Sequence, residues 1–197
     1  MLNPPGHASL AELARSTLNV IDHEHAELTS LVALFYSGLQ RLGEFELVAP
    51  DAVPPDYRRL LDHHSHMTVA LESFHGTRLQ LNVLAVRESN AFYARKISLA
   101  RRSDGKTILF GLVRIHPYLV PAPAMEAIRQ QSAPLGQLLI EYGVLREVER
   151  TQLWRVHPSA ELCQVFELPA PAEIFGRTAL IYCNGVPAIE LLEIIAL

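Results

Sequence analysis

The chain has 197 residues, 49% of them hydrophobic, and its formal net charge is −4. Its 17 basic and 21 acidic residues are spread without blocks, which argues against a nucleic-acid or anionic-membrane partner. No apolar run reaches the roughly 18 residues that span a bilayer, and the N-terminus lacks the apolar stretch of a secretory signal. We therefore expect a cytoplasmic protein with one buried core, in a single domain over residues 1–197 with an N-terminal extension.

The N-terminal quarter of the sequence has helical patterns. Apolar side chains recur at helical spacing over residues 22–42, which predicts a helix there. Prolines interrupt the next stretch, so residues 45–54 are expected to form a connection, and another helix is expected to start near Asp56. This helix should loosen at about residues 65–68 and restart toward Phe74.

Beyond residue 76 the hydrophobic period changes from helical to two-residue. Residues 79–83 alternate between apolar and polar side chains, as a half-buried strand does. Two further strands are expected at about 92–100 and 107–116. Because a turn sequence at 103–105 separates them, they are expected to form an antiparallel hairpin.

The last third of the chain is expected to contain two short helices and three strands. The helices are expected at 124–131 and 134–143, and the strands at 145–156, 177–183 and 186–195. An Asn-Gly turn joins the last two strands. The sequence therefore predicts an α+β fold, a mostly antiparallel sheet with helices packed on one face or end.

Three charged residues interrupt apolar strand patterns: Arg95, Arg114 and Glu193. By the two-residue period, each lies on a face expected to be buried. A guanidinium offers a planar fork of donors that matches a carboxylate, and a nearby buried acid can exchange a proton. These side chains could hold an anionic ligand. Alternatively, an arginine pairs internally with Glu193 or Glu190, or its charge reaches water at a sheet edge.

Other kinds of site have weaker support. Residues 62–66 hold an aspartate and three histidines, the densest set of metal-capable side chains, but a metal site needs three or four converging ligands. We therefore expect no metal and no cofactor. Cys163 and Cys183 are expected to be free thiols of the core. No nucleophile-elbow or phosphate-loop motif occurs.

Four segments, in order, resemble the chorismate pyruvate-lyase family, including its divergent branch in archaea and actinobacteria. They are His66-Met67-Thr68 before Gly76, the strand 93–99 with its hairpin partner, the helix start 133–139, and the stretch from Gly176-Arg177 to Glu193. The match covers about residues 55–197 and leaves 1–50 as a helical extension. The resemblance implies a chorismate lyase-like fold with an internal ligand cavity under helical flaps. It also implies cofactor-free conversion of chorismate to 4-hydroxybenzoate and pyruvate, in the synthesis of quinones or other aromatic metabolites.

The resemblance also implies roles for individual residues. Arg95 corresponds to the family arginine that grips the ring carboxylate, and Glu193 to the acid beside the ring oxygen, where it would act as general acid or base. The backbone N–H groups at Met67 and Leu135 would be further donors to the anionic substrate. Thr68 would lie beside Met67 in the same substrate-binding segment.

One position departs from the family pattern. The better-known enzymes carry a second arginine directly after the glycine that corresponds to Gly111, whereas this chain has Leu112. Arg114 lies two residues further on the same strand face, and we expect it to replace that arginine and stabilise the leaving enolpyruvate.

Two other functions stay open. The first is a binding module for a small aromatic carboxylate without catalysis, because effector domains of some transcription regulators share the fold. The second is a related enzyme with another chorismate-derived substrate, in a cavity reshaped by Leu112.

Overall fold

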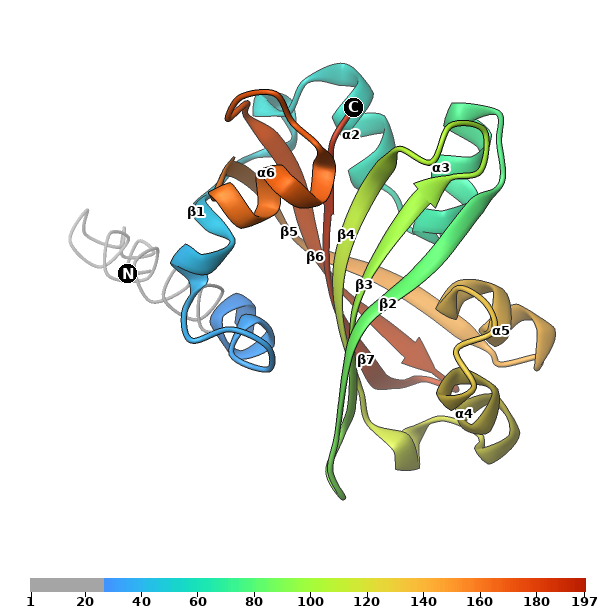
Figure 1. Cartoon of the computed structure of the whole chain (residues 1–197). Coiled ribbons are helices and arrows are strands. Elements are labelled where there is room, and N and C mark those ends of the chain that lie inside the picture. Colours follow the sequence, from blue (N-terminus) through green and yellow to red (C-terminus); the bar gives the residue numbers. More distant parts are fainter. Residues whose placement is uncertain (1–26) are drawn as a thin grey trace, which may run out of the picture.

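A computed structural model describes residues 27–197 (Figure 1). One seven-stranded antiparallel sheet, in the order β1-β5-β6-β7-β4-β3-β2, forms its centre. The strands are β1 (Gly43–Leu47), β2 (Leu79–Glu88), β3 (Tyr93–Arg101), β4 (Thr107–Ile115), β5 (Arg146–Pro158), β6 (Ile174–Cys183) and β7 (Val186–Ile195). The helices are α2 (Pro55–Leu61), α3 (Met67–His75), α4 (Ala122–Arg129), α5 (Leu135–Glu141) and α6 (Ala160–Phe166), with short 3-10 turns at Leu39–Arg41, Pro50–Ala52 and Pro117–Leu119.

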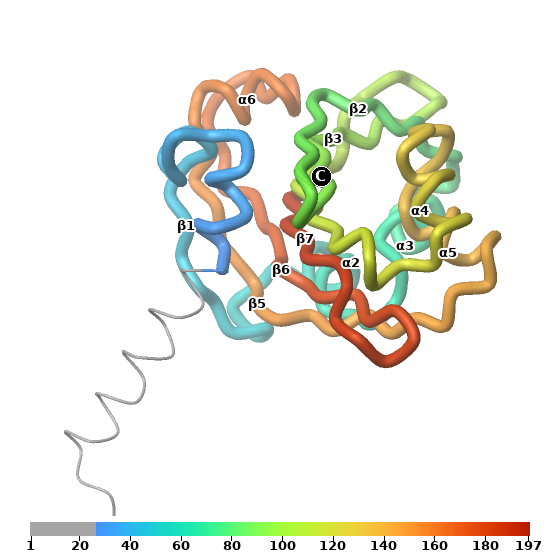
Figure 2. Tube along the Cα trace, turned by 90° about the horizontal axis from the view of Figure 1, so that it is seen from below, coloured from blue at the N-terminus to red at the C-terminus, as the bar shows by residue number. Residues whose placement is uncertain are grey.

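The sheet is covered on both faces. Helices α2 to α5 cover one face, called here the pocket face, which carries Leu109, Gly111 and Val113 of β4. Helix α6 and the helical residues 27–32 cover the other, called the opposite face, which carries Phe110 and Leu112. Figure 2 shows the two groups of covering segments on either side of the sheet. The expectation of helices on one face or end was therefore wrong, although the α+β class and the antiparallel sheet are confirmed.

The central strands are apolar because both of their faces are buried. Every residue of β4 from Ile108 to Val113 is buried, a pattern that strict alternation with solvent would not give. For this reason, a charge on a central strand lies in an interior whichever face it occupies. The register of the strand decides whether the charge lies in the core of the pocket face or in that of the opposite face.

Most predicted elements of the core are confirmed. A helix starts at Pro55 as predicted, but it is interrupted at residues 62–66 and not at 65–68, and α3 begins at Met67, earlier than the predicted restart toward Phe74. The β3–β4 hairpin and the strands β5 and β7 also occur where they were expected, whereas β6 begins at Ile174, before the predicted start at Arg177. Asn184 and Gly185, both with positive φ, form the predicted turn between β6 and β7.

The N-terminal prediction was partly wrong. The part of the predicted helix before residue 27 lies outside the described residues, and within them the helix ends at Val32, not at residue 42. Residues 43–47 form strand β1 where a helical extension and a connection were expected. A Cβ at Gly43, whose φ is 142°, would lie 2.2 Å from the carbonyl oxygen of His157, so glycine permits this close pairing with β5.

Helix α6 was not predicted. Its N-cap residue Ser159 accepts a hydrogen bond from the backbone N–H of Leu162, and Leu162 and Phe166 are buried against the opposite face. Within residues 27–197, the helices are all too short or too polar to cross a membrane.

Candidate functional site

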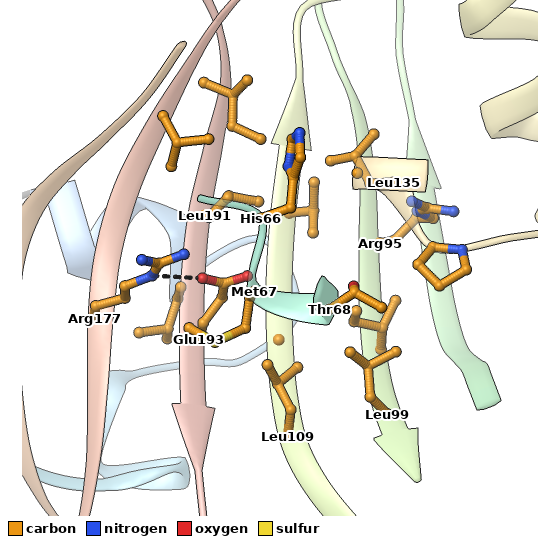
Figure 3. A pocket seen from close by; sticks show the side chains of 18 of the residues that line it. His66, Met67, Thr68, Arg95, Leu99, Leu109, Leu135, Arg177, Leu191 and Glu193 are labelled. Carbon is orange, nitrogen blue, oxygen red and sulfur yellow. Dashed lines mark hydrogen bonds and ion pairs between the residues drawn. The ribbon is translucent and has the colours of Figure 1, made fainter. Parts of the chain in front are cut away.

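A pocket lies between the pocket face of the sheet and the first residues of α3 and α5 (Figure 3). The cavity has a volume of about 50 Å³. Strands β3 to β7 form its floor, and residues 65–68 and 134–136 form its roof. Apolar side chains form most of the wall, so the few polar groups in it define what the pocket can bind.

Arg95 is the most deeply buried charge in this wall. Its side chain is 0% exposed, and its Nε and Nη1 have no hydrogen-bond partner among the residues that the structure describes. Burial lowers the pKa of its guanidinium. Because an uncompensated buried cation is costly, the site is suited to an anion that accepts these two N–H groups.

Arg177 and Glu193 form an ion pair on the neighbouring strands β6 and β7. Nε of Arg177 donates to Oε2 of Glu193 over 2.7 Å, and the two side chains are 1% and 14% exposed. Nη1 of Arg177 also donates to the carbonyl oxygen of His63 at 3.0 Å. Arg177 therefore holds the carboxylate in place and ties the link between α2 and α3 to the sheet.

Gly111 lies between these two charged groups. It is opposite Glu193 on β7 and opposite Ile97 on β3. Arg95 and Glu193 are thus two strands and two residues apart, which places their Cα atoms about 12 Å from each other. Gly111 has no side chain, and a Cβ there would lie 3.1 Å from Cγ1 of Ile97 and 3.4 Å from Cδ2 of Leu109, so these two side chains pack over β4 between the guanidinium and the carboxylate.

The other predicted site residues divide into two groups. Met67, Thr68 and Leu135 line the pocket, at the first turns of α3 and α5, where the helix leaves backbone N–H groups without intrahelical acceptors. The role of the backbone N–H groups at Met67 and Leu135 as donors to the ligand stays a prediction, as does the contact of Thr68 with the substrate. Leu112 and Arg114 do not line the pocket.

The placement of Arg114 and Leu112 in the site was wrong. Arg114 pairs in register with Ala94, next to Arg95, so its side chain lies on the opposite face of the sheet. There its Nε donates to Oε1 of Glu190 at 3.0 Å, its Nη2 bonds to the other carboxylate oxygen, and its Nη1 donates to Ser30 at 2.8 Å. Leu112 is fully buried in the same core. The internal ion pair considered for Arg114 is therefore the correct interpretation.

Sequence reasoning missed Arg177 as a site residue. The strand was predicted to begin at Arg177, and a charge at the end of a strand is ordinarily solvated. In the structure β6 begins at Ile174, so Arg177 lies inside the strand and is buried. The apolar residues Ile174 and Phe175 before Gly176 could have indicated that the strand starts earlier and contains Arg177.

The histidines of residues 62–66 do not converge. Nδ1 of His64 contacts the carbonyl oxygen of Val148, whereas His66 lies against Arg146. Within residues 27–197, no group of three or more His, Cys, Asp and Glu side chains is arranged to hold a metal ion. Cys163 and Cys183 are both free thiols.

Comparisons with known proteins give a fold and no family. No family model and no curated protein matches the sequence. Among solved structures, PhnF from Mycobacterium smegmatis is 13% identical with a TM-score of 0.52, covering 66% of this chain and 63% of its own. The ligand-binding domain of a predicted GntR-family transcriptional regulator from Bordetella bronchiseptica is 13% identical with a TM-score of 0.47, covering 60% and 85%.

At these identities the likeness extends to the fold alone. The chain spans 63% of the length of PhnF. The seven-stranded antiparallel sheet with its flanking helices is the chorismate lyase-like α+β fold that the sequence resemblance implied.

Proposed function

We propose that the pocket binds a small aromatic or pre-aromatic carboxylate and that the protein is a lyase that converts chorismate to 4-hydroxybenzoate and pyruvate. The observation that carries the proposal is the buried guanidinium of Arg95, whose Nε and Nη1 lack partners in the described part of the chain. A ligand carboxylate would accept both N–H groups and neutralise the buried charge.

The proposed reaction uses the two ends of the pocket differently. With the ring carboxylate on Arg95, the ring would extend over Gly111 toward Glu193. The ether C–O bond breaks, its electron pair leaves with the oxygen of enolpyruvate, and the ring loses a proton to become aromatic. Glu193 would transfer this proton, and enolpyruvate becomes pyruvate when protonated. Since aromatisation supplies driving force, the residues need only position the substrate, exclude water and move the proton.

Arg177 supports this role in two ways. It orients the Glu193 carboxylate through Oε2, which leaves Oε1 for the substrate. It also brings a second guanidinium to the pocket wall, although from β6 and not from the position after Gly111 that the family uses. We propose that Arg177, in place of Arg114, stabilises negative charge on the leaving enolpyruvate.

A second candidate function is binding of the same class of ligand without turnover. It is favoured by the pairing of Arg177 with Glu193, which neutralises the second guanidinium of the pocket wall within the chain. The two candidates share the Arg95 contact and differ only in whether a bond of the ligand breaks.

The discriminating experiment measures binding and turnover on the same preparation. Purified protein is incubated with chorismate, pyruvate is followed by coupled reduction with lactate dehydrogenase, and 4-hydroxybenzoate is identified by chromatography. Pyruvate with stoichiometric 4-hydroxybenzoate supports the lyase. Calorimetric binding of 4-hydroxybenzoate without pyruvate supports the second candidate, and neither binding nor turnover contradicts both.

The Glu193→Gln variant tests the proposed proton transfer. Glutamine keeps the size of the side chain and an oxygen acceptor for Arg177 but cannot carry the proton, so we expect kcat to fall about 100-fold. Affinity for 4-hydroxybenzoate should change little. A variant with unchanged kcat would remove Glu193 from the mechanism.

A further inference from the structure

His66 lies where the two parts of the pocket roof meet. It is the N-cap residue of α3 and lines the pocket. Its ring rests on Gly136 of α5, because a Cβ at that glycine would lie 2.8 Å from both Cγ and Nδ1 of His66. Gly136 also lines the pocket, so the ring of His66 packs on Gly136 at the pocket wall.

The other nitrogen of the ring is already engaged. The Nε–H of Arg146, on β5, donates to Nε2 of His66. An arginine side chain in a protein has donors and no acceptor, so Nε2 must be the unprotonated nitrogen in this contact. The bond at one ring nitrogen therefore assigns the proton to the other, Nδ1.

The surroundings of the His66 ring favour its neutral form. Burial lowers the pKa of His66, and the guanidinium of Arg146 lowers it further. Glu193 acts in the opposite direction and Arg177 in the same direction as Arg146. Among residues 27–197, no carboxylate forms a salt bridge with Arg146 that would weaken its effect on the ring.

We propose that Arg146 fixes His66 as a neutral imidazole with its proton on Nδ1, and that this N–H is a further hydrogen-bond donor to the pocket's anionic ligand. The second half of this inference rests on the proposed function, that the pocket binds a small carboxylate. Arg146, which does not line the pocket, acts only as a positioning residue for His66.

The first test needs no ligand. Nitrogen-15 NMR of the full chain at neutral pH, with the signal assigned by its loss in His66→Gln, reports which ring nitrogen carries the proton. We expect protonated Nδ1 in the wild-type protein and a shift toward protonated Nε2 in Arg146→Met. The matched control is Arg155→Met, which removes a cation from the same strand at a site that pairs with Glu46. A wild-type ring protonated at Nε2, or one unaffected by Arg146→Met, overturns the proposal.

The second test measures the donor with 4-hydroxybenzoate as the probe, by isothermal titration calorimetry. In His66→Asn an amide N–H can take the place of Nδ1, whereas in His66→Gln the amide reaches the place of Nε2. We expect His66→Asn to keep most of the affinity and His66→Gln to lose about tenfold, the effect of one hydrogen bond to a charged group. Arg146→Met should also weaken binding, and Arg155→Met should not. Equal affinities for the two His66 variants overturn the ligand contact.

The two tests separate the failure of this inference from that of the proposed function. If the wild-type protein binds neither chorismate nor 4-hydroxybenzoate, the proposed function and the ligand contact are both wrong, and the NMR result still decides the role of Arg146. If wild-type binding is intact and the two His66 variants behave alike, only the inference about His66 is wrong.

Discussion

Arg95 and Arg114 lie on adjacent strands, each inside an apolar stretch, and they face opposite sides of the same sheet. On the opposite face, Arg114 has a carboxylate and a hydroxyl as partners, and its side chain is 20% exposed. On the pocket face, Arg95 is fully buried, and its Nε and Nη1 lack partners among the described residues. The same pattern in the sequence thus corresponds to a structural ion pair in one place and to a candidate binding group in the other.

The two arginines differ in whether their charge and their N–H donors have partners within the described residues. A paired internal charge is neutralised within the chain and needs no ligand to compensate it. An unpaired internal charge lowers stability and persists where a ligand compensates it. Removing each arginine should therefore have opposite consequences for stability and for binding.

The largest expected effect is that of Arg95→Met on binding. Loss of the charge-assisted hydrogen bonds to the carboxylate should weaken binding of 4-hydroxybenzoate about 100-fold, measured by calorimetry. Because the substitution removes a buried charge and keeps most of the side-chain volume, the ligand-free protein should melt at the same temperature or higher. A melting temperature several degrees lower would mean that Arg95 has a structural role instead.

Arg114→Met should show the reverse, with a smaller effect. It leaves Glu190 partly buried, with His116 at 3.3 Å as its remaining ion-pair partner among residues 27–197. We expect the free energy of unfolding, from urea denaturation, to fall by about 1 kcal/mol. Binding of 4-hydroxybenzoate should be unchanged, and the double variant Arg114→Met, Glu190→Gln should recover part of the loss. A large loss of affinity would contradict the placement of Arg114 outside the pocket.

The smallest expected effect is a pH dependence of stability that originates on the pocket face. Burial lowers the pKa of His63, His66 and His75 below the ordinary value of 6.5. Below pH 6.5 the unfolded chain therefore binds protons that the folded protein does not, and the free energy of unfolding should decrease as the pH falls from 6.5 toward 5.5. Urea denaturation across this range checks the sign, and His66→Gln should flatten the slope. Stability that rises on acidification would contradict it.

Most helices and strands of the core could be predicted from the sequence. The two elements that were not predicted, β1 and α6, were missed for the same reason. Strand β1 is short and forms through pairing with β5, more than a hundred residues away, so no local pattern marks it. Helix α6 has only 7 residues. Its apolar side chains Leu162 and Phe166 are buried through packing against the sheet, which is formed by distant segments of the chain. Both elements depend on distant partners, which a local period cannot represent.

The sequence by itself determined the order of the core elements and the presence of charges at Arg95, Arg114 and Glu193, because hydrophobic period, turn residues and helix starts are local properties. Only the tertiary structure decided which charge met which partner. The register of β4 with β7 places Arg114 opposite Glu190, and the register of β3 with β4 places Arg95 opposite Val113 on the pocket face. The register of β6 with β7 places Arg177 opposite Glu193. Because a shift of one residue exchanges the two faces of a strand, this choice belongs to the folded sheet as a whole.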